Sequence, residues 1–511
     1  MSEASSKKQK TDGSIDKTCI DTIRILGADI VQKSNSGHPG APMGCAPMAH
    51  TLFNKVMRYS PAHPKWANRD RFVLSNGHSC ALLYTMLHLS GYERPTMPDL
   101  QNFRQLNAVT AGHPENYLLD GVEVSTGPLG QGISNAVGLA IAETHLAATF
   151  NQNNMAPLVD HKTYVICGDG CLQEGVSSEA CSLAGHLKLG KLIVLYDDND
   201  ITIDGGTNLS FTEDVAKRFE AYGWHVQTVA DGNSTDTSSL EAAIAAAQAE
   251  TSRPSLIKVK TIIGFGSAKQ GTHSVHGAPL GAEDIENVKA KFGFDPKQSF
   301  VVPDTVRAAY GECVNNGNAA VTEWNALLNE YKSAVPDAMK EFERRITGAL
   351  PEGWMDALPK YVAGTDKDKA SRNYSQDVIN ALAPLLPEMM GGSADLTPSN
   401  KTNFKGCIDF QAATPHGRYL RFGVREHGMA AICNGMAAHG GILPYCATFL
   451  NFVGYALGAI RVTSLSHFRV IYVMTHDSIG LGEDGPTHQP IETLCSLRSM
   501  PNHLVVRPAD G

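Results

Sequence analysis

An aspartate and an asparagine that each follow a short apolar run are the residues of this sequence whose chemistry is easiest to define. Residues 163–167 (TYVIC) lead to Asp169, and residues 191–196 (KLIVLY) lead to Asn199. Both runs have the length and composition of buried parallel strands, and the segment between them is long enough for a crossover helix. Right-handed crossovers bring the ends of parallel strands to one edge of a sheet, so we expect both side chains to face one site.

The side chains at this edge indicate a hard cation. One carboxylate and one amide oxygen are too few and too hard for Zn²⁺, but they suit Mg²⁺, which takes its other ligands from a diphosphate and water. Gly168 and Gly170 flank the aspartate and let the backbone approach a diphosphate closely. Taken alone, the same residues are also typical of an Asp-Gly turn followed by an Asn loop. The second strand and its Asn, in register with the first, favour the metal site.

Alternating strand-like and helix-like segments predict the domain that holds this edge. From about residue 15 to residue 300, apolar strand candidates such as residues 71–74 (RFVL) and 255–263 (SLIKVKTII) alternate with helical segments. This pattern is typical of a doubly wound α/β domain. We therefore predict such a domain over residues 1–300.

A second alternating stretch predicts a second α/β domain over residues 372–511. Its strand candidates are residues 442–449 (ILPYCATF) and 468–475 (FRVIYVMT). The intervening residues 301–371 are rich in helix formers and charge, so we predict a helical linker there. The predicted fold class is therefore α/β, with two similar domains joined by a helical arm.

The composition of the chain excludes several classes of protein. Its 511 residues, of which 42% are hydrophobic and 19% charged, are enough for two or more domains. The formal net charge of −9 and the lack of a long basic stripe argue against nucleic acid as a partner. No apolar run approaches membrane-spanning length, so we expect no membrane association. Eleven cysteines without CxxC pairs indicate reduced thiols and a cytoplasmic location.

Ordered motifs along nearly the whole chain resemble those of the transketolase family of thiamine diphosphate enzymes. The spacing from Gly168-Asp169-Gly170 to Asn199 resembles the cofactor fingerprint of thiamine diphosphate enzymes. Further segments that resemble the family lie at residues 34–44, 72–84, 111–115, 125–138, 273–281, 391–400, 425–435, 448–456 and 475–492. The resemblance implies a diphosphate-binding domain followed by a pyrimidine-binding domain. It also implies a third domain that this chain lacks, with the second domain truncated at its C-terminal end and any organellar address there lost.

The resemblance implies that thiamine diphosphate is bound with Mg²⁺, for which Ca²⁺ or Mn²⁺ can substitute. The metal ligands that it implies are Asp169, Asn199 and Ile201. Leu129 resembles the apolar wedge that holds the cofactor bent. The full set of implied cofactor contacts is His78, Gly127, Leu129, Gly170, Asn199, His276, Asp395, Glu426, Phe449, Phe452 and Tyr455.

Glu426 is implied to be the carboxylic acid that activates the cofactor through its pyrimidine ring. Small and apolar neighbours at the start of a predicted helix fit a carboxyl group that keeps its proton. The alternative is an ordinary Glu that is solvated or paired with Arg425. Phe449, Phe452 and Tyr455 resemble the wall on which the pyrimidine ring rests, although their spacing of three is also that of a protein core.

Histidines in loop motifs are implied to contact the sugar substrate, because imidazoles with a pKa near neutrality can give or take protons. The resemblance assigns catalytic roles to Glu426, His38, His276 and His488, and substrate contacts to His38, His113, His276, Arg372, Ser399, His476, Asp484 and His488. Of these, Arg372, Ser399 and His476 match the phosphate-binding positions. The alternatives are that Arg372 pairs with nearby aspartates and that Asp484 belongs to an Asp-Gly turn. Glu174 and Glu179 resemble acids that connect the cofactors of two subunits, or are ordinary helix-face carboxylates.

The function implied is the reversible transfer of a two-carbon ketol unit from a ketose phosphate to an aldose phosphate in the pentose phosphate pathway. The family also implies a homodimer with its active sites at the subunit interface. Two alternatives stay open at this point. One is a sister enzyme with the same cofactor, such as dihydroxyacetone synthase or deoxyxylulose phosphate synthase. The other is a regulatory paralogue without cofactor, against which the intact Asp169, Asn199 and Glu426 argue.

Overall fold

The first sheet carries the predicted metal edge. The computed structural model describes residues 13–511, so residues 1–12 of the predicted first domain lie outside the described residues. Five parallel strands follow the order β1-β2-β3-β5-β4. Their bounds are β1 Arg71–Leu74, β2 Thr163–Gly168, β3 Leu192–Asp198, β4 His225–Val229 and β5 Ser255–Lys260.

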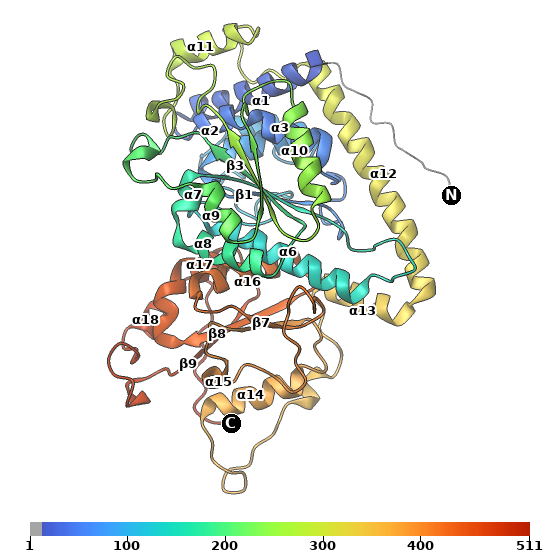
Figure 1. Ribbon diagram of the computed structural model, residues 1–511, viewed down its shortest axis with the longest axis vertical. Coiled ribbons are helices and arrows are strands. Elements are labelled where there is room, and N and C mark those ends of the chain that lie inside the picture. The colour runs from blue at the N-terminus through green and yellow to red at the C-terminus, as the bar shows by residue number, and fades with distance from the viewer. Residues whose placement is uncertain (1–12) are drawn as a thin grey trace.

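Alternation along the strands explains why helices cover both faces of this sheet. Tyr164 and Ile166 of β2 pack with the helices α1 (Gly13–Ser34) and α4 (Cys80–Leu89). Val165 and Cys167 pack in a second cluster with α6 (Gln131–Phe150) and α8 (Gly175–His186). Successive side chains of a strand point to opposite faces, so a continuous apolar run requires cover on both sides. Figure 1 shows the sheet between α1 on one face and α6 and α8 on the other.

The second domain has four parallel strands in the order β7-β6-β8-β9. The strands are β6 Met389–Ser393, β7 Tyr419–Arg421, β8 Leu443–Phe449 and β9 Ile471–Thr475. The helices of this domain are α14 Ser371–Leu382, α15 Thr397–Asn400, α16 Glu426–His439, α17 Val453–Leu465 and α18 Thr493–Arg498. The two-domain parallel α/β fold is therefore as the sequence predicted.

The linker is helical over only part of its length. Helices α12 (Asp304–Ala334) and α13 (Pro336–Thr347) run along the first domain toward the second (Figure 1). Residues 348–370 form turns and one short 3₁₀ segment at Trp354–Ala357. Two prolines and three glycines in that stretch prevent a helix there, so the predicted helical linker is helical only as far as Thr347.

Helices α6 and α16 pack so closely that the two domains share one core. A Cβ atom on Gly435 would collide with the backbone carbonyl of Asn135, and one on Gly138 would collide with that of Ile432. The Asn135 amide also donates a buried hydrogen bond of 2.8 Å to the carbonyl of Ala431. Side chains of both domains belong to one buried cluster around this contact.

Among residues 13–511, no helix is both long enough and apolar enough to span a membrane.

Candidate active site

The ends of β2 and β3 bring Asp169 and Asn199 to one edge, as the spacing predicted. Asp169 begins the short helix α7 (Asp169–Gln173) directly after β2, and only 4% of it is exposed. Its Oδ1 accepts a hydrogen bond from the Tyr196 hydroxyl, whereas its buried Oδ2 has no partner among the described residues. Burial raises the pKa of Asp169 to about 7. A buried acceptor without a donor is costly, and a bound cation would satisfy it.

The amide of Asn199 has a defined orientation. Its Nδ2 donates to Oδ2 of Asp197 at 2.8 Å, and its Oδ1 accepts from the backbone N–H of Ile201 at 3.0 Å. Tyr196 and Asp197 were not predicted as site residues. Their positions two and three residues before Asn199 offered a signal. Their hydrogen bonds, however, depend on which neighbouring side chains the register of the sheet brings close.

Three histidines form a cluster on the first domain. The ring centroids of His38, His78 and His276 lie 4.9 to 5.7 Å apart. Burial lowers the pKa of all three rings, to about 4 for His38. The Nδ1 atoms of His38 and His276 are buried without a partner among the described residues. Neutral imidazoles of this kind can accept or donate a proton at a substrate hydroxyl.

Gly127 and Gly170 each lie close to a predicted site residue of the first domain. A Cβ atom on Gly170 would lie 2.7 Å from Cδ1 of Leu129, so the predicted wedge lies against the turn that follows β2. A Cβ atom on Gly127 would lie 3.2 Å from the ring of His113. His113 also adjoins the histidine cluster, since its charge would lower the pKa of His38 and of His78.

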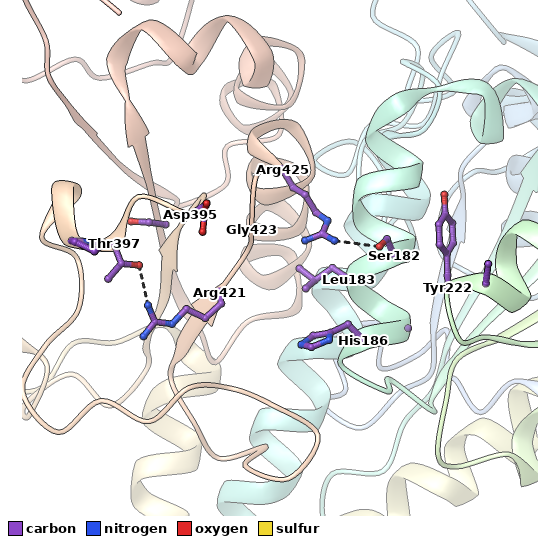
Figure 2. A pocket seen from close by; sticks show the side chains of 13 residues that line it. Ser182, Leu183, His186, Tyr222, Asp395, Thr397, Arg421, Gly423 and Arg425 are labelled. Atoms are coloured by element: carbon purple, nitrogen blue, oxygen red, sulfur yellow. Dashed lines mark hydrogen bonds between the residues drawn. The ribbon is translucent and has the colours of Figure 1, made fainter. Parts of the chain in front are cut away.

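Glu426 is the first residue of α16 and is 8% exposed. Burial raises the pKa of its carboxyl group. Arg425 does not pair with it. The Arg425 guanidinium donates to the carbonyl of Phe422 at 2.9 Å and to Oγ of Ser182 at 3.2 Å, and Figure 2 shows the bond to Ser182. Glu179 lies next to this acid, since its Oε2 accepts from the backbone N–H of Gly428 at 2.6 Å. Burial raises the pKa of Glu179, and the charge of Glu426 raises it further.

Aromatic rings and histidines form a second group on the second domain. Phe449 and Phe452 stack with centroids 5.8 Å apart, and Tyr455 lies 6.0 Å from Phe452. Tyr455 is 67% exposed, so the core interpretation of this spacing was wrong for that residue. The ring of His476 lies 3.7 Å from Phe449, and that of His488 lies 5.1 Å from Phe452.

Arg372 adjoins this aromatic group. Its Nη1 lies 3.0 Å from Nε2 of His476, and burial together with the Arg372 charge lowers the pKa of that histidine. The segment that contains Ser399 lies near His476, because the hydroxyl of Thr475, which precedes His476, donates to the side chain of Asn400 at 2.6 Å. Arg372 makes no ion pair among residues 13–511, although aspartates precede and follow it. Asp484 lies in an exposed turn, and its charge partly offsets this lowering of the His476 pKa.

A cavity of about 710 Å³ lies between α8 and the carboxyl ends of β6 and β7. Figure 2 shows Asp395 and Arg425 on its wall, opposite His186 and Tyr222 of the first domain. Asp395 is the one predicted cofactor contact among the residues that line this cavity. Sequence reasoning gave no signal for the others, because they come from distant segments.

The two groups of site residues lie on different domains of the chain. Among the described residues, no hydrogen bond or ring contact joins the histidine cluster and Asp169 to the aromatic group around Phe449. Each domain therefore presents part of a site.

Comparisons with known proteins agree with the motifs and the fold. Residues 15–351 match the family "Transketolase, thiamine diphosphate binding domain", and residues 367–511 match "Transketolase, pyrimidine binding domain". The chain is 56% identical to a chloroplastic transketolase of Solanum tuberosum over 98% of its own length and 68% of the relative's. It is 56% identical to transketolase 1 of Saccharomyces cerevisiae, covering 97% of this chain and 73% of the relative.

A solved structure of similar fold is a transketolase of Pichia stipitis in complex with sedoheptulose 7-phosphate. It has a TM-score of 0.95 and 55% identity over 98% of this chain and 74% of its own. A transketolase of Leishmania mexicana has a TM-score of 0.93 and 54% identity, covering 95% and 72%.

Proposed function

Because the chain belongs to the transketolase family and is a thiamine diphosphate-dependent transferase, we propose that its site moves a two-carbon ketol unit between sugar phosphates. The donor is a ketose phosphate such as xylulose 5-phosphate, and the acceptor an aldose phosphate such as ribose 5-phosphate or erythrose 4-phosphate, as in the pentose phosphate pathway. The observation that carries this proposal is the buried, unpartnered Oδ2 of Asp169 beside the glycine turn.

Asp169 and Asn199 hold Mg²⁺, together with the backbone of Ile201 and the cofactor's diphosphate. The donor set is all oxygen and includes one carboxylate, which suits a small hard cation, with Ca²⁺ or Mn²⁺ as substitutes. The hydrogen bond from Ile201 to Asn199 supports this arrangement, because it keeps the amide oxygen on the side of the Ile201 backbone.

Thiamine diphosphate, when bound, supplies a nucleophilic thiazolium carbon that accepts the two-carbon unit. Glu426 keeps a proton for the pyrimidine ring, which its buried position and raised pKa favour. Leu129 supports the bent cofactor, and the phenyl rings of Phe449 and Phe452 give its pyrimidine ring a flat surface, continued by Tyr455. The remaining contacts in this proposal are His78, Gly127, Gly170, His276 and Asp395.

The substrate lies between the neutral histidines and a phosphate site. His38, His113, His276 and His488 exchange protons with the hydroxyls around the broken and formed carbon–carbon bond. Arg372, Ser399 and His476 bind the terminal phosphate, a role supported by the unpartnered Nε of Arg372 and its contact with His476. Asp484 accepts from a hydroxyl of the donor sugar.

The working enzyme is a homodimer in which the first domain of one subunit meets the second domain of the other. Two observations support this. The two groups of site residues are separate within one chain, and the second domain exposes large apolar side chains such as Val424 and Ile491 beside its share of the site.

Domain bounds and compartment complete the proposal. The diphosphate-binding domain spans residues 1–300, the linker 301–371 and the pyrimidine-binding domain 372–511. The compartment is the cytoplasm, a reducing environment that fits eleven cysteines without CxxC pairs.

The metal assignment predicts that Asp169→Ala abolishes tight cofactor binding, because the cation loses its only carboxylate ligand. Titrating thiamine diphosphate at several Mg²⁺ concentrations, with tryptophan fluorescence as the signal, measures this. We expect the apparent affinity to fall at least 100-fold. Cofactor affinity equal to that of the unmodified protein would remove Asp169 from the metal site. Asp204→Ala, in the exposed loop that follows Asn199, is the matched control and should bind normally.

A further inference from the structure

Two consecutive residues at the end of β3 contact the two proposed metal ligands from opposite faces of the sheet. Tyr196 belongs to the buried cluster under α6 and α8, whereas Asp197 points to the other face, where Thr261 and Cys45 contact it. Both side chains are almost fully buried, at 2% and 1% exposed. Adjacent residues of a strand alternate between faces, so one strand end can hold two ligands at once.

Tyr196 decides which oxygen of Asp169 is available. Its hydroxyl donates to Oδ1, and Oδ2 is left buried and unpartnered among the described residues. A carboxylate on a freely rotating side chain could turn either oxygen toward a cation. The hydroxyl removes that freedom, because turning the carboxylate would break a buried hydrogen bond.

Asp197 decides which end of the Asn199 amide is available. Its Oδ2 accepts from Nδ2 of Asn199 at 2.8 Å, and its Oδ1 accepts from the hydroxyl of Thr261. An amide presents either a carbonyl oxygen or an NH₂ group, and only the oxygen can bind a cation. With its NH₂ group held by Asp197, Asn199 directs its oxygen to the other side, where Ile201 also lies.

We propose that Tyr196 and Asp197 are positioning residues that fix Asp169 and Asn199 in the geometry that Mg²⁺ requires. This inference rests on the proposed metal site at Asp169 and Asn199. Mg²⁺ needs nearly ideal octahedral geometry with short bonds, whereas Ca²⁺ tolerates irregular coordination. The two residues therefore favour Mg²⁺ over Ca²⁺, beyond merely stabilising the fold.

The test for Tyr196 is Tyr196→Phe, which removes one hydroxyl and keeps the ring. We expect a 10- to 100-fold increase in the Mg²⁺ concentration needed to half-saturate thiamine diphosphate binding, the usual effect of losing an outer-shell partner. The Ca²⁺ requirement should rise much less. The matched control is Tyr164→Phe, since Tyr164 is also a buried sheet tyrosine whose hydroxyl has one amide partner, Gln248 at 2.7 Å.

A double-mutant cycle separates positioning from stability. If Tyr196 acts through Asp169, then Tyr196→Phe should change the Mg²⁺ requirement less than twofold when Asp169→Asn is already present. Equal effects in both backgrounds, an equal loss for Mg²⁺ and Ca²⁺, or an effect no larger than that of Tyr164→Phe would overturn the proposal for Tyr196. If Asp169→Ala lowers cofactor affinity while Tyr196→Phe does not, this inference fails and the metal site stands.

The test for Asp197 is Asp197→Ala, read by the same titration. We expect the Mg²⁺ concentration needed for half-saturation to rise at least 10-fold, and the Ca²⁺ concentration to rise less. The replacement leaves buried donors unpaired, so Thr261→Val provides a milder variant that removes only one donor to Asp197. We expect the milder variant to stay folded and to lose Mg²⁺ preference in the same direction. An unchanged Mg²⁺-to-Ca²⁺ ratio in Thr261→Val and in a folded Asp197→Ala would contradict the role of Asp197.

Discussion

Several of the side chains expected to do chemistry carry a buried polar atom without a partner. Oδ2 of Asp169, Nδ1 of His38 and Nε of Arg372 all lie in the interior with no hydrogen-bond partner among residues 13–511. Protein interiors rarely leave polar atoms in this state, because each such atom loses its bonds to water. These atoms are therefore the ones that a metal, a cofactor or a substrate would satisfy.

At the residue scale, Glu426→Ala should slow cofactor activation far more than it weakens cofactor binding. The metal and diphosphate contacts remain in this variant, whereas the proton for the pyrimidine ring is lost. We expect exchange of the cofactor's C2 hydrogen for deuterium, followed by NMR, to slow by about 100-fold or more. Glu323→Ala, a change at an exposed position of α12, should leave exchange unchanged. Fast exchange in Glu426→Ala with lost turnover would assign Glu426 another role.

At the element scale, the strands were the easiest part of the structure to predict. β1 has the predicted bounds, and β2 extends its predicted run by one residue. The strand β5 ends at Lys260, three residues before its apolar run does, because Thr261 instead turns its hydroxyl to Asp197. The apolar pattern shows where a strand can form. It does not show where a side-chain hydrogen bond to a neighbouring strand ends the strand pairing.

The same limit applies to the site. The edge at Asp169 and Asn199 follows from the βαβ pattern, since chain order fixes which strand ends are neighbours. The role of Tyr196 could not be predicted, because it depends on Oδ1 of Asp169, which the start of α7 places beside the Tyr196 hydroxyl. The roles given to His38, Arg372 and Asp484 came from family resemblance, and local patterns in those loops are too weak to give them.

The contact between α6 and α16 makes a prediction about stability. Gly435→Ala should destabilise the protein by about 1–3 kcal/mol or more, since the added methyl group overlaps the backbone of Asn135 and forces the helices apart. Urea unfolding measures the change. Gly311→Ala is the matched control, because Gly311 lies within α12 where a Cβ atom meets nothing within 4 Å. That control should be neutral or stabilising by up to about 1 kcal/mol. Equal stability of both variants would contradict the close contact.

At the scale of the whole molecule, a pair of buried histidines joins the two domains. Nε2 of His161, which precedes β2, lies 2.8 Å from Nε2 of His439 at the end of α16. Nδ1 of His439 donates to the carbonyl of Gly440 at 2.9 Å, so its Nε2 is the acceptor for the His161 N–H. Protonation of His439 would turn that acceptor into a donor and break the bond.

This pair should make the folded state sensitive to acid. Burial, with the charge of Arg71 next, lowers the pKa of His161 well below its usual value and that of His439 to about 3. Both rings are neutral in the fold, whereas in the unfolded chain they bind protons below about pH 6.5. The contribution of this pair to the free energy of unfolding is therefore complete above that pH and is lost as the pH falls toward 3.

His439→Gln tests this, because the glutamine oxygen can still accept from His161 while one titrating group is removed. Between pH 7 and pH 5 the variant should lose about 2 kcal/mol less unfolding free energy than the unmodified protein, measured in urea at each pH. His416→Gln, at an exposed histidine, should follow the unmodified protein. Parallel pH curves for His439→Gln and the unmodified protein would refute the link.

The glycine contact between α6 and α16 also limits how the enzyme can move. Domains joined by a small polar surface can swing apart, whereas a large apolar contact prevents this. Here the backbones of Gly138 and Gly435 touch the opposing helix, inside a single core. The two domains of one chain therefore cannot undergo a hinge closure around a sugar. In the proposed dimer, each half of a site therefore belongs to a rigid subunit, and any gating falls to loops such as the exposed turn around Asp484.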